Sequence, residues 1–281
     1  MSTEPDEGES FPRMRREKET VREQQQEGVG IGWDGQTLRE QFEALEEKTE
    51  ETGHYAGFEK LELKQDNPIE YEQMFAQLRG DLVNARETSK EVAATPIVEQ
   101  EGELCYGLFT PEGDSIAVST GIIVHIHTMS EAIKYMINHD YEESPGIEPG
   151  DIFVNNDTHV GDVHACDIMT LIPIFHDGEL VAWAGGVNHV IDTGAIGPGS
   201  MNVSQASRFG DGAYYTARKV GEDLKLYNSW KKDYPDKTRT PDFLKLDERT
   251  RMTGCLMIRD AVKDIINEYG VEQFKQLSRE A

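Results

Sequence analysis

Long apolar runs are missing from this sequence, and cysteine is scarce. No run of about 18 or more residues is predominantly apolar, so we expect no membrane span. The N-terminus, MSTEPDEGES, has neither a basic start nor an apolar core, which excludes a typical secretory signal. Cys105, Cys166 and Cys255 are odd in number and widely spaced. They indicate reduced thiols and a cytoplasmic protein rather than a disulfide framework.

Positive charge is also scarce. The 281 residues include 28 Lys and Arg against 53 Asp and Glu, which gives a formal net charge of −25. Such a surface repels the phosphates of nucleic acids and of anionic lipids, so we expect neither nucleic acid nor a membrane as a partner. Two explanations of the acidity stay open: a highly soluble surface, or the cytoplasm of a halophile, where molar salt screens the repulsion.

Three motifs of catalysis, redox chemistry and nucleotide binding are absent from the sequence. There is no G-x-S-x-G and no C-x-x-C. The glycine-rich segment 194–199, GAIGPG, lacks the lysine of a phosphate-binding loop. We therefore expect no recognised ATP-binding motif in this chain, and a loop at 194–199 that brings backbone close to a site.

The sequence divides into two regions of different composition. Residues 1–57 are rich in Glu, Gln and Arg and are predicted to be an acidic, partly disordered N-terminal region, in which the first 28 or so bury almost nothing. Residues 58–281 are predicted to be globular. We expect helices over about 38–49, 67–90 and 128–139 and from 247 onward, and strands over 104–110, 115–119, 152–154, 168–175 and 180–187. The order of these elements predicts an α+β fold with a mixed, largely antiparallel sheet and flanking helices.

Histidines and aspartates gather in one part of the globular region. Neutral imidazole and ionised carboxylate are the ligands that a divalent metal ion takes at neutral pH. The spacing His164-x-x-Asp167 is short enough for both side chains to reach one ion if the backbone turns. The residues of this cluster are Asp157, His159, Asp162, His164, Asp167, His189 and Asp192.

A predicted hairpin brings the two ends of the cluster together. Asp-Gly at 177–178 lies between two apolar runs and indicates a two-residue turn. Regular pairing outward from this turn places Cys166 opposite His189. It also places His164 and His189 on one face of the sheet and Asp167 on the other. A shared ion therefore requires a bulge near Cys166 or a register that slips by one residue.

His164, Asp167 and His189 form the predicted ligand set. Two imidazoles and one carboxylate leave coordination positions open, which suits catalysis at manganese, iron or zinc. A structural zinc site is not expected, because Cys166 has no partner thiol. For His159 and Asp162, a role as loop residues and a role in the site stay open. Four other histidines are predicted to be structural rather than ligands: His125, His127, His139 and His176.

Several motifs resemble the hydantoinase B/5-oxoprolinase family. They include Asn156-Asp157, His164-x-x-Asp167-Ile168 and His189-x-x-Asp192-x-Gly194. Within that family, residues 96–105 (PIVEQEGELC) and 247–251 (DERTR) are similar to the alpha subunits of acetone carboxylases. The resemblance runs from about residue 54 to the C-terminus. Family alpha subunits are much longer, so residues 58–281 would be the N-terminal portion of a hydantoinase B/oxoprolinase-like domain in a truncated chain.

The resemblance implies a metal-binding catalytic alpha subunit of an ATP-dependent acetone carboxylase. Such an enzyme is a carbon–carbon bond-forming ligase that converts acetone and bicarbonate to acetoacetate. The family's ligands fall on His164, Asp167 and His189 and imply Mn(II), with Fe or Zn as alternatives. ATP would be used on a hydantoinase A-like beta subunit, and a gamma subunit completes the complex. Asp192, which would orient His189, and Asp157 are the candidate catalytic residues beside the ion.

Two alternatives to this function stay open. One is an ATP-dependent amide hydrolase of the 5-oxoprolinase or N-methylhydantoinase type, which would share the ligands and differ in substrate. Residues 98–104 and 192–197 argue against it because they are carboxylase-like. The other is a truncated, non-catalytic subunit that binds metal or a partner without turnover.

Overall fold

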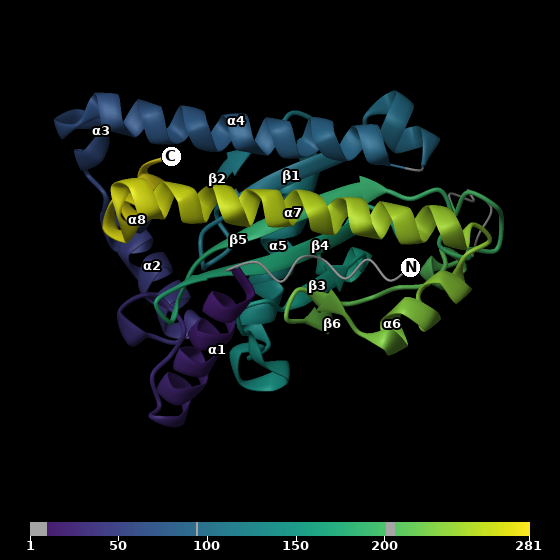
Figure 1. The fold of residues 1–281 in the computed structure, drawn as a ribbon, viewed down its shortest axis with the longest axis horizontal. Helices are drawn as coiled ribbons and strands as arrows, with labels where there is room; N and C mark the ends of the chain where they lie inside the picture. The colour runs from purple at the N-terminus through teal and green to yellow at the C-terminus, as the bar shows by residue number, and fades with distance from the viewer. Residues whose placement is uncertain (1–9, 94, 201–205) are drawn as a thin grey trace.

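The computed structural model describes residues 10–93, 95–200 and 206–281, and these contain one seven-stranded sheet (Figure 1). Its strands are β1 (Leu104–Phe109), β2 (Ser115–Val118), β3 (Ile152–Asn155), β4 (Asp167–His176), β5 (Glu179–His189), β6 (Arg218–Glu222) and β7 (Lys225–Leu226). The strand order is β2-β1-β5-β4-β3-β6-β7, and every described pairing is antiparallel. The predicted α+β class is confirmed, whereas the β6–β7 hairpin was not predicted.

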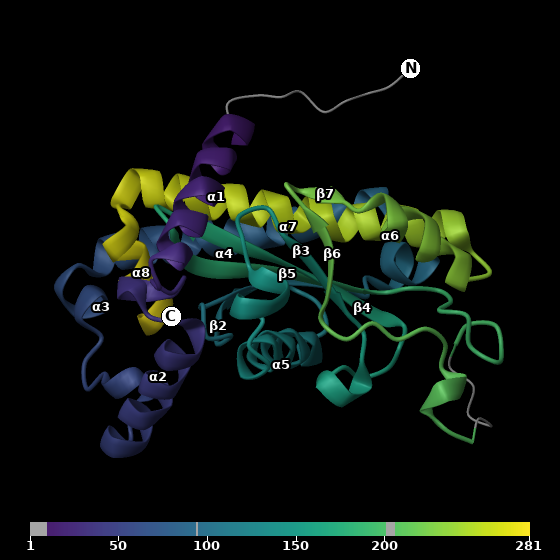
Figure 2. The same cartoon turned by 90° about the horizontal axis from the view of Figure 1, so that it is seen from below.

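Helices cover both faces of the sheet. They are α1 (Ser10–Gln26), α2 (Leu38–Thr52), α3 (Glu62–Asp66), α4 (Pro68–Val92), α5 (Val124–Asn138), α6 (Asn228–Asp233), α7 (Pro241–Tyr269) and α8 (Val271–Glu280). α4 and α7 pack side by side over one face, and α5 covers the other (Figure 1 and Figure 2). β1, β4 and β5 are consequently buried along nearly their whole length. Among the described residues, no helix is both long enough and apolar enough to span a membrane.

The β4–β5 hairpin turns where the sequence predicts. Asp177 and Gly178 have φ angles of 48° and 90°. A two-residue hairpin turn of type I′ requires positive φ angles at both of these positions. The register then shifts between Ile174 and Phe175, so the strands pair one residue out of step beyond that point. Asp167, and not Cys166, therefore lies opposite His189. The prediction of Cys166 opposite His189 is wrong, because a bulge near the turn supplies the slip of one residue.

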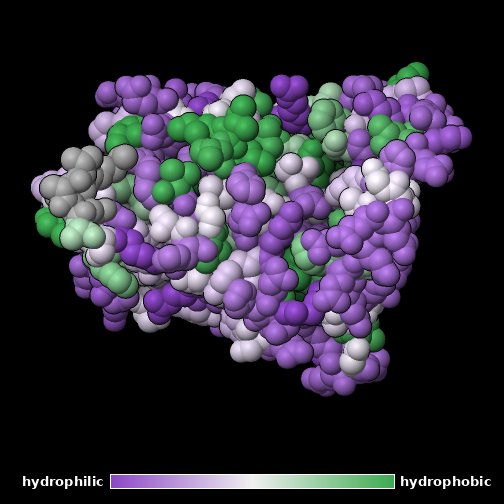
Figure 3. All heavy atoms as spheres, turned by 180° about the vertical axis from the view of Figure 1, so that it is seen from behind, coloured by the Kyte–Doolittle hydropathy of each residue, from purple (hydrophilic) through white to green (hydrophobic). Residues whose placement is uncertain are grey.

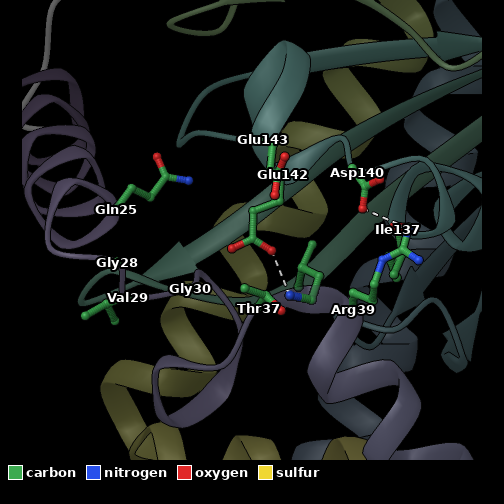
Figure 4. Close-up of a pocket in the computed structure, with 11 residues that line it drawn as sticks. Gln25, Gly28, Val29, Gly30, Thr37, Arg39, Ile137, Asp140, Glu142 and Glu143 are labelled. Atoms are coloured by element: carbon green, nitrogen blue, oxygen red, sulfur yellow. Dashed lines mark hydrogen bonds and ion pairs between the residues drawn. The ribbon is translucent and has the colours of Figure 1, made fainter.

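The N-terminal region packs against the domain. α1 buries Met14 and Val21, so the prediction that these first residues bury almost nothing is wrong for 10–28. Residues 1–9 lie outside the described part of the chain. Both oxygens of the Glu142 carboxylate accept backbone N–H groups, from Ile31 at 2.9 Å and from Leu38 at 2.7 Å. Figure 4 shows Glu142 among the residues that line the neighbouring cavity. A cavity of about 380 Å³ lies beside this contact. The division of the chain near residue 57 stays a prediction.

Three details of the helices differ from the predictions. α5 begins at Val124, four residues before the predicted start at Thr128. Thr128 is buried and donates its hydroxyl to a backbone carbonyl one turn earlier, so it does not cap the helix. α7 begins at Pro241, ahead of the predicted start at residue 247. Ile69 was expected on the buried face of α4 but is 71% exposed.

Candidate metal centre

His164, Asp167 and His189 meet where β4 begins and β5 ends. The backbone N–H of Asp167 donates to the carbonyl of His164 at 3.0 Å, which closes the turn that the His-x-x-Asp spacing requires. His164 Nε2 lies 3.3 Å from Asp167 Oδ2, and His189 Nδ1 lies 3.2 Å from Asp167 Oδ1. One ligand atom from each residue lies within 4.8 Å of the others. The structure thus brings the three predicted ligands together.

The two histidines of this cluster have raised pKa values. Burial disfavours a charged His189, but hydrogen bonding to Asp167 and Cys166 outweighs it and raises the pKa of His189 to about 10. Hydrogen bonding to Cys166, together with the charge of Asp167, raises the pKa of His164 against the effect of burial. His189 therefore holds a proton beside the buried Asp167 carboxylate, in the position where a cation would neutralise it.

The cluster fits a divalent cation. Two nitrogen donors and one carboxylate suit manganese, iron or zinc, and they leave positions free for other ligands. His164 Nδ1 is buried and has no hydrogen-bond partner among the described residues. Cys166 is not among the three residues whose ligand atoms converge. Asp167 and His189 are buried, whereas the His164 side chain is 28% exposed, so the centre opens on the His164 side.

A buried asparagine holds the loop that carries His164. Asn156 donates its side-chain amide to the carbonyl of Ala165 at 2.7 Å and to that of Ala213 at 2.9 Å. Its side-chain oxygen accepts the backbone N–H of Tyr215 at 2.7 Å. Because Ala165 directly follows His164, these bonds fix the ligand-bearing loop to the segment after β5.

Asp157 and Asp192 have partners other than the three ligands. Asp157 accepts hydrogen bonds from Arg208 and Thr216, at 2.9 and 2.6 Å. Asp192 accepts a hydrogen bond from Arg239 at 2.6 Å. It also accepts hydrogen bonds from hydroxyl groups of residues in neighbouring loops. From the sequence we expected Asp192 to orient His189. None of the described contacts joins these two residues. The described contacts give both aspartates a part in fixing the loops around the centre.

Two residues beside the cluster were not predicted as part of the site. Glu103 Oε2 lies 3.4 Å from His189 Nδ1, and the backbone of Glu103 accepts the His189 N–H at 3.2 Å. The pairing of β1 with β5 places Glu103 there, which sequence spacing does not reveal. His125 was predicted to be a structural histidine, yet its Nε2 lies 3.9 Å from Asp167 Oδ1. For His159 and Asp162, a role in a loop and a role in the site were both left open. His159 is exposed and Asp162 is buried, and neither belongs to the group of converging ligand atoms.

Known proteins similar to this chain share one family. The family model for hydantoinase B/oxoprolinase matches residues 67–281. The acetone carboxylase alpha subunit of Xanthobacter autotrophicus is 51% identical over 252 residues, which is 90% of this chain and 32% of that protein. The acetophenone carboxylase delta subunit of Aromatoleum aromaticum is 30% identical and covers 63% of this chain and 26% of its own length. The chain thus spans about a third, or less, of these relatives.

Solved structures agree with the family match. A nucleotide-free structure of acetone carboxylase matches 90% of this chain and 33% of its own, with a TM-score of 0.88 and 50% identity. An ATP-dependent caprolactamase from Pseudomonas jessenii matches 73% of this chain and 35% of its own, with a TM-score of 0.63 and 20% identity, which shows the fold alone. The chain therefore belongs to the hydantoinase B/oxoprolinase family.

Proposed function

We propose that this chain is the metal-binding part of an acetone carboxylase-type alpha subunit. The reaction proposed is the ATP-dependent joining of acetone and bicarbonate to give acetoacetate. One observation carries the proposal: His164, Asp167 and His189 converge within 4.8 Å in a fold that matches an acetone carboxylase with a TM-score of 0.88. Mn(II) is the proposed ion, with Fe or Zn as alternatives, because the donor set combines imidazole with carboxylate.

The residues of this chain bind, orient and shield the reacting groups. A Mn(II) ion in the centre would supply positive charge that stabilises the oxygen of an acetone enolate. Asp167 and His189 keep their side of the centre free of water because they are buried, and His164 borders the open side. Apolar side chains gather on the face of the molecule that α5 covers (Figure 3). Residues 122–124 are two isoleucines and a valine, which lie just before α5 and at its first position, and all three are exposed. This apolar stretch directly precedes His125 and suits a small ketone better than a charged substrate.

The ATP chemistry is assigned to a partner subunit. The chain has no recognised nucleotide-binding motif in its sequence, and two of its relatives are named as subunits of carboxylases. We propose a hydantoinase A-like beta subunit that activates the substrates with ATP, and a gamma subunit that completes the complex. A dry interface between subunits would protect the activated species from hydrolysis.

The affinity for Mn(II) should rise with pH. His189 must lose its proton to bind the ion, and its pKa in the metal-free chain is raised to about 10. Between about pH 6.5 and about pH 8.5, Mn(II) therefore competes with at least the proton of His189, and we expect a gain in affinity of about tenfold or more per pH unit. Electron paramagnetic resonance of free Mn(II) measures this affinity at each pH. A dissociation constant that does not change with pH would contradict the assignment of His189.

The metal-free chain should show the opposite dependence. The folded-state pKa of His189 lies above its unfolded value of about 6.5, so the protonated pair with Asp167 stabilises the fold fully below that pH. This contribution is lost as the pH rises towards 10. Bound Mn(II) replaces the proton and should remove this particular loss of stability.

The purified chain with Mn(II) should show no acetone-dependent ATP hydrolysis. Its sequence contains no recognised nucleotide-binding motif, and the carboxylation needs binding energy and water exclusion from further surfaces. Activity should appear only when a beta-like subunit and the remaining part of a full-length alpha subunit are added, because this chain covers 32% of the alpha subunit that it resembles. Phosphate and acetoacetate are measured at low salt and at molar salt, because the net charge of −25 favours a screened, folded chain at high salt.

The same assay separates the competing functions. Acetoacetate formed by this chain alone would overturn the division of labour between subunits. ATP hydrolysis that depends on 5-oxoproline and not on acetone would favour an amide hydrolase; a 5-oxoprolinase of Dictyostelium discoideum is 24% identical over 67% of this chain. No turnover with any partner, combined with intact Mn(II) binding, would favour a non-catalytic subunit.

A further inference from the structure

His125 is a buried imidazole in the first turn of α5, beside the ligand cluster. Only 3% of the residue is exposed, and its Nε2 lies 3.9 Å from Asp167 Oδ1. Its Nδ1 is buried and has no hydrogen-bond partner among the described residues. The side chain therefore has one polar neighbour of opposite charge within 4 Å, and this neighbour is the carboxylate of the candidate metal centre.

The surroundings of His125 select its tautomer. A neutral imidazole carries one N–H, on either Nδ1 or Nε2. A proton on Nδ1 would leave a buried donor unsatisfied, which costs about 1–3 kcal/mol. A proton on Nε2 points towards the Asp167 carboxylate. We assign the N–H of His125 to Nε2 for this reason.

Metal binding changes which groups hydrogen-bond to Asp167. In the structure His189 donates to Asp167 Oδ1 at 3.2 Å, and His164 lies 3.3 Å from Oδ2. A ring nitrogen that binds an ion presents its lone pair to the ion and no longer donates to a carboxylate. Ligating carboxylates are themselves held by hydrogen bonds from outside the ligand set. Once the ion is bound, Asp167 needs another donor.

We propose that His125 is the residue that positions Asp167 for metal binding. Its Nε2 lies 3.9 Å from Asp167 Oδ1 and must approach by about 0.7 Å or more to donate a hydrogen bond as the ion draws away the two ligand histidines. His125 is not itself a ligand, because it does not belong to the group of atoms that lie within 4.8 Å of one another. The inference rests on the proposed function, since it requires that the centre binds a divalent ion.

A pair of similar-sized substitutions tests this role in the full 281-residue chain. His125→Gln and His125→Met both keep a side chain of moderate length, and only glutamine retains an N–H donor. We expect His125→Met to weaken Mn(II) binding by about 10- to 100-fold, and His125→Gln to recover most of the affinity. His127→Met is the matched control, because the His127 side chain lies two residues later on α5 and is 74% exposed. Mn(II) affinity is measured by electron paramagnetic resonance, and the melting temperature by circular dichroism.

The outcomes separate this inference from the proposed function. A merely structural His125 would lower the melting temperature in both variants and change their Mn(II) affinity equally, which would overturn the positioning role. Parent-like affinity in His125→Met would overturn it as well. Failure of the unsubstituted, folded chain to bind Mn(II) would instead overturn the proposed function on which the inference depends.

Discussion

His189→Ala should weaken Mn(II) binding by more than about 100-fold, whereas His176→Ala should leave it unchanged. His189 supplies one of three converging ligand atoms and is buried against Asp167. His176 lies at the other end of the same hairpin, and its Nε2 is 3.4 Å from the exposed Asp177. His176 is partly buried beside the turn, so its loss affects packing there and not the centre.

Titration of both variants with Mn(II), followed by electron paramagnetic resonance, gives the two affinities. Circular dichroism must show that each variant is folded, because the hairpin runs through the centre of the sheet. Equal losses of affinity would mean that the ligand assignment is wrong. A large loss in His189→Ala alone supports the ligand set that both the hairpin and the family resemblance indicate.

The turn of this hairpin was predictable, and its register was not. Asp177-Gly178 acts locally, because positive φ angles at both positions suit these two residues. The bulge between Ile174 and Phe175 has no such local signal. β4 and β5 are buried on both faces, so neither strand alternates between apolar and polar residues in a way that would reveal a slip of one position.

Contacts between distant parts of the chain explain most other differences. The helix predicted from about residue 38 forms, and its capping box of Thr37 and Glu40 is a local feature that lies within four residues. The docking of the N-terminal region on Glu142 joins positions more than a hundred residues apart, and no local pattern in the sequence predicts it. His125 was treated as a structural residue for the same reason, since only the packing of α5 on the sheet places it beside Asp167.

Residues of the motif at 247–251 make hydrogen bonds to other parts of the fold. The sequence identified these residues as carboxylase-like without giving them a role. In the structure Asp247 accepts a hydrogen bond from the backbone of Thr95, and Glu248 accepts one from the Trp230 indole. Arg251 is fully buried and donates to Asn188, the residue before His189. The motif therefore connects α7 to the strand that carries His189, a candidate metal ligand.

Arg251→Met should lower the free energy of unfolding by about 3 kcal/mol. The guanidinium donates to Asn188 Oδ1 at 2.5 Å, to Thr170 Oγ1 at 3.2 Å and to the Tyr234 hydroxyl at 3.3 Å. Methionine fills much of the same volume but leaves these buried acceptors without a donor. It also removes the positive charge that faces Glu248, whose pKa burial already raises.

Arg249→Met is the matched control for this change, because Arg249 lies two residues earlier on α7 and is exposed. Its effect should stay within about 0.5 kcal/mol. Urea unfolding of both metal-free variants, with equal m-values, measures the difference. Equal stabilities of the two variants would show that the buried guanidinium contributes no net stability. A loss confined to Arg251→Met, together with weaker Mn(II) binding, would show that the contact with Asn188 helps to hold His189 at the centre.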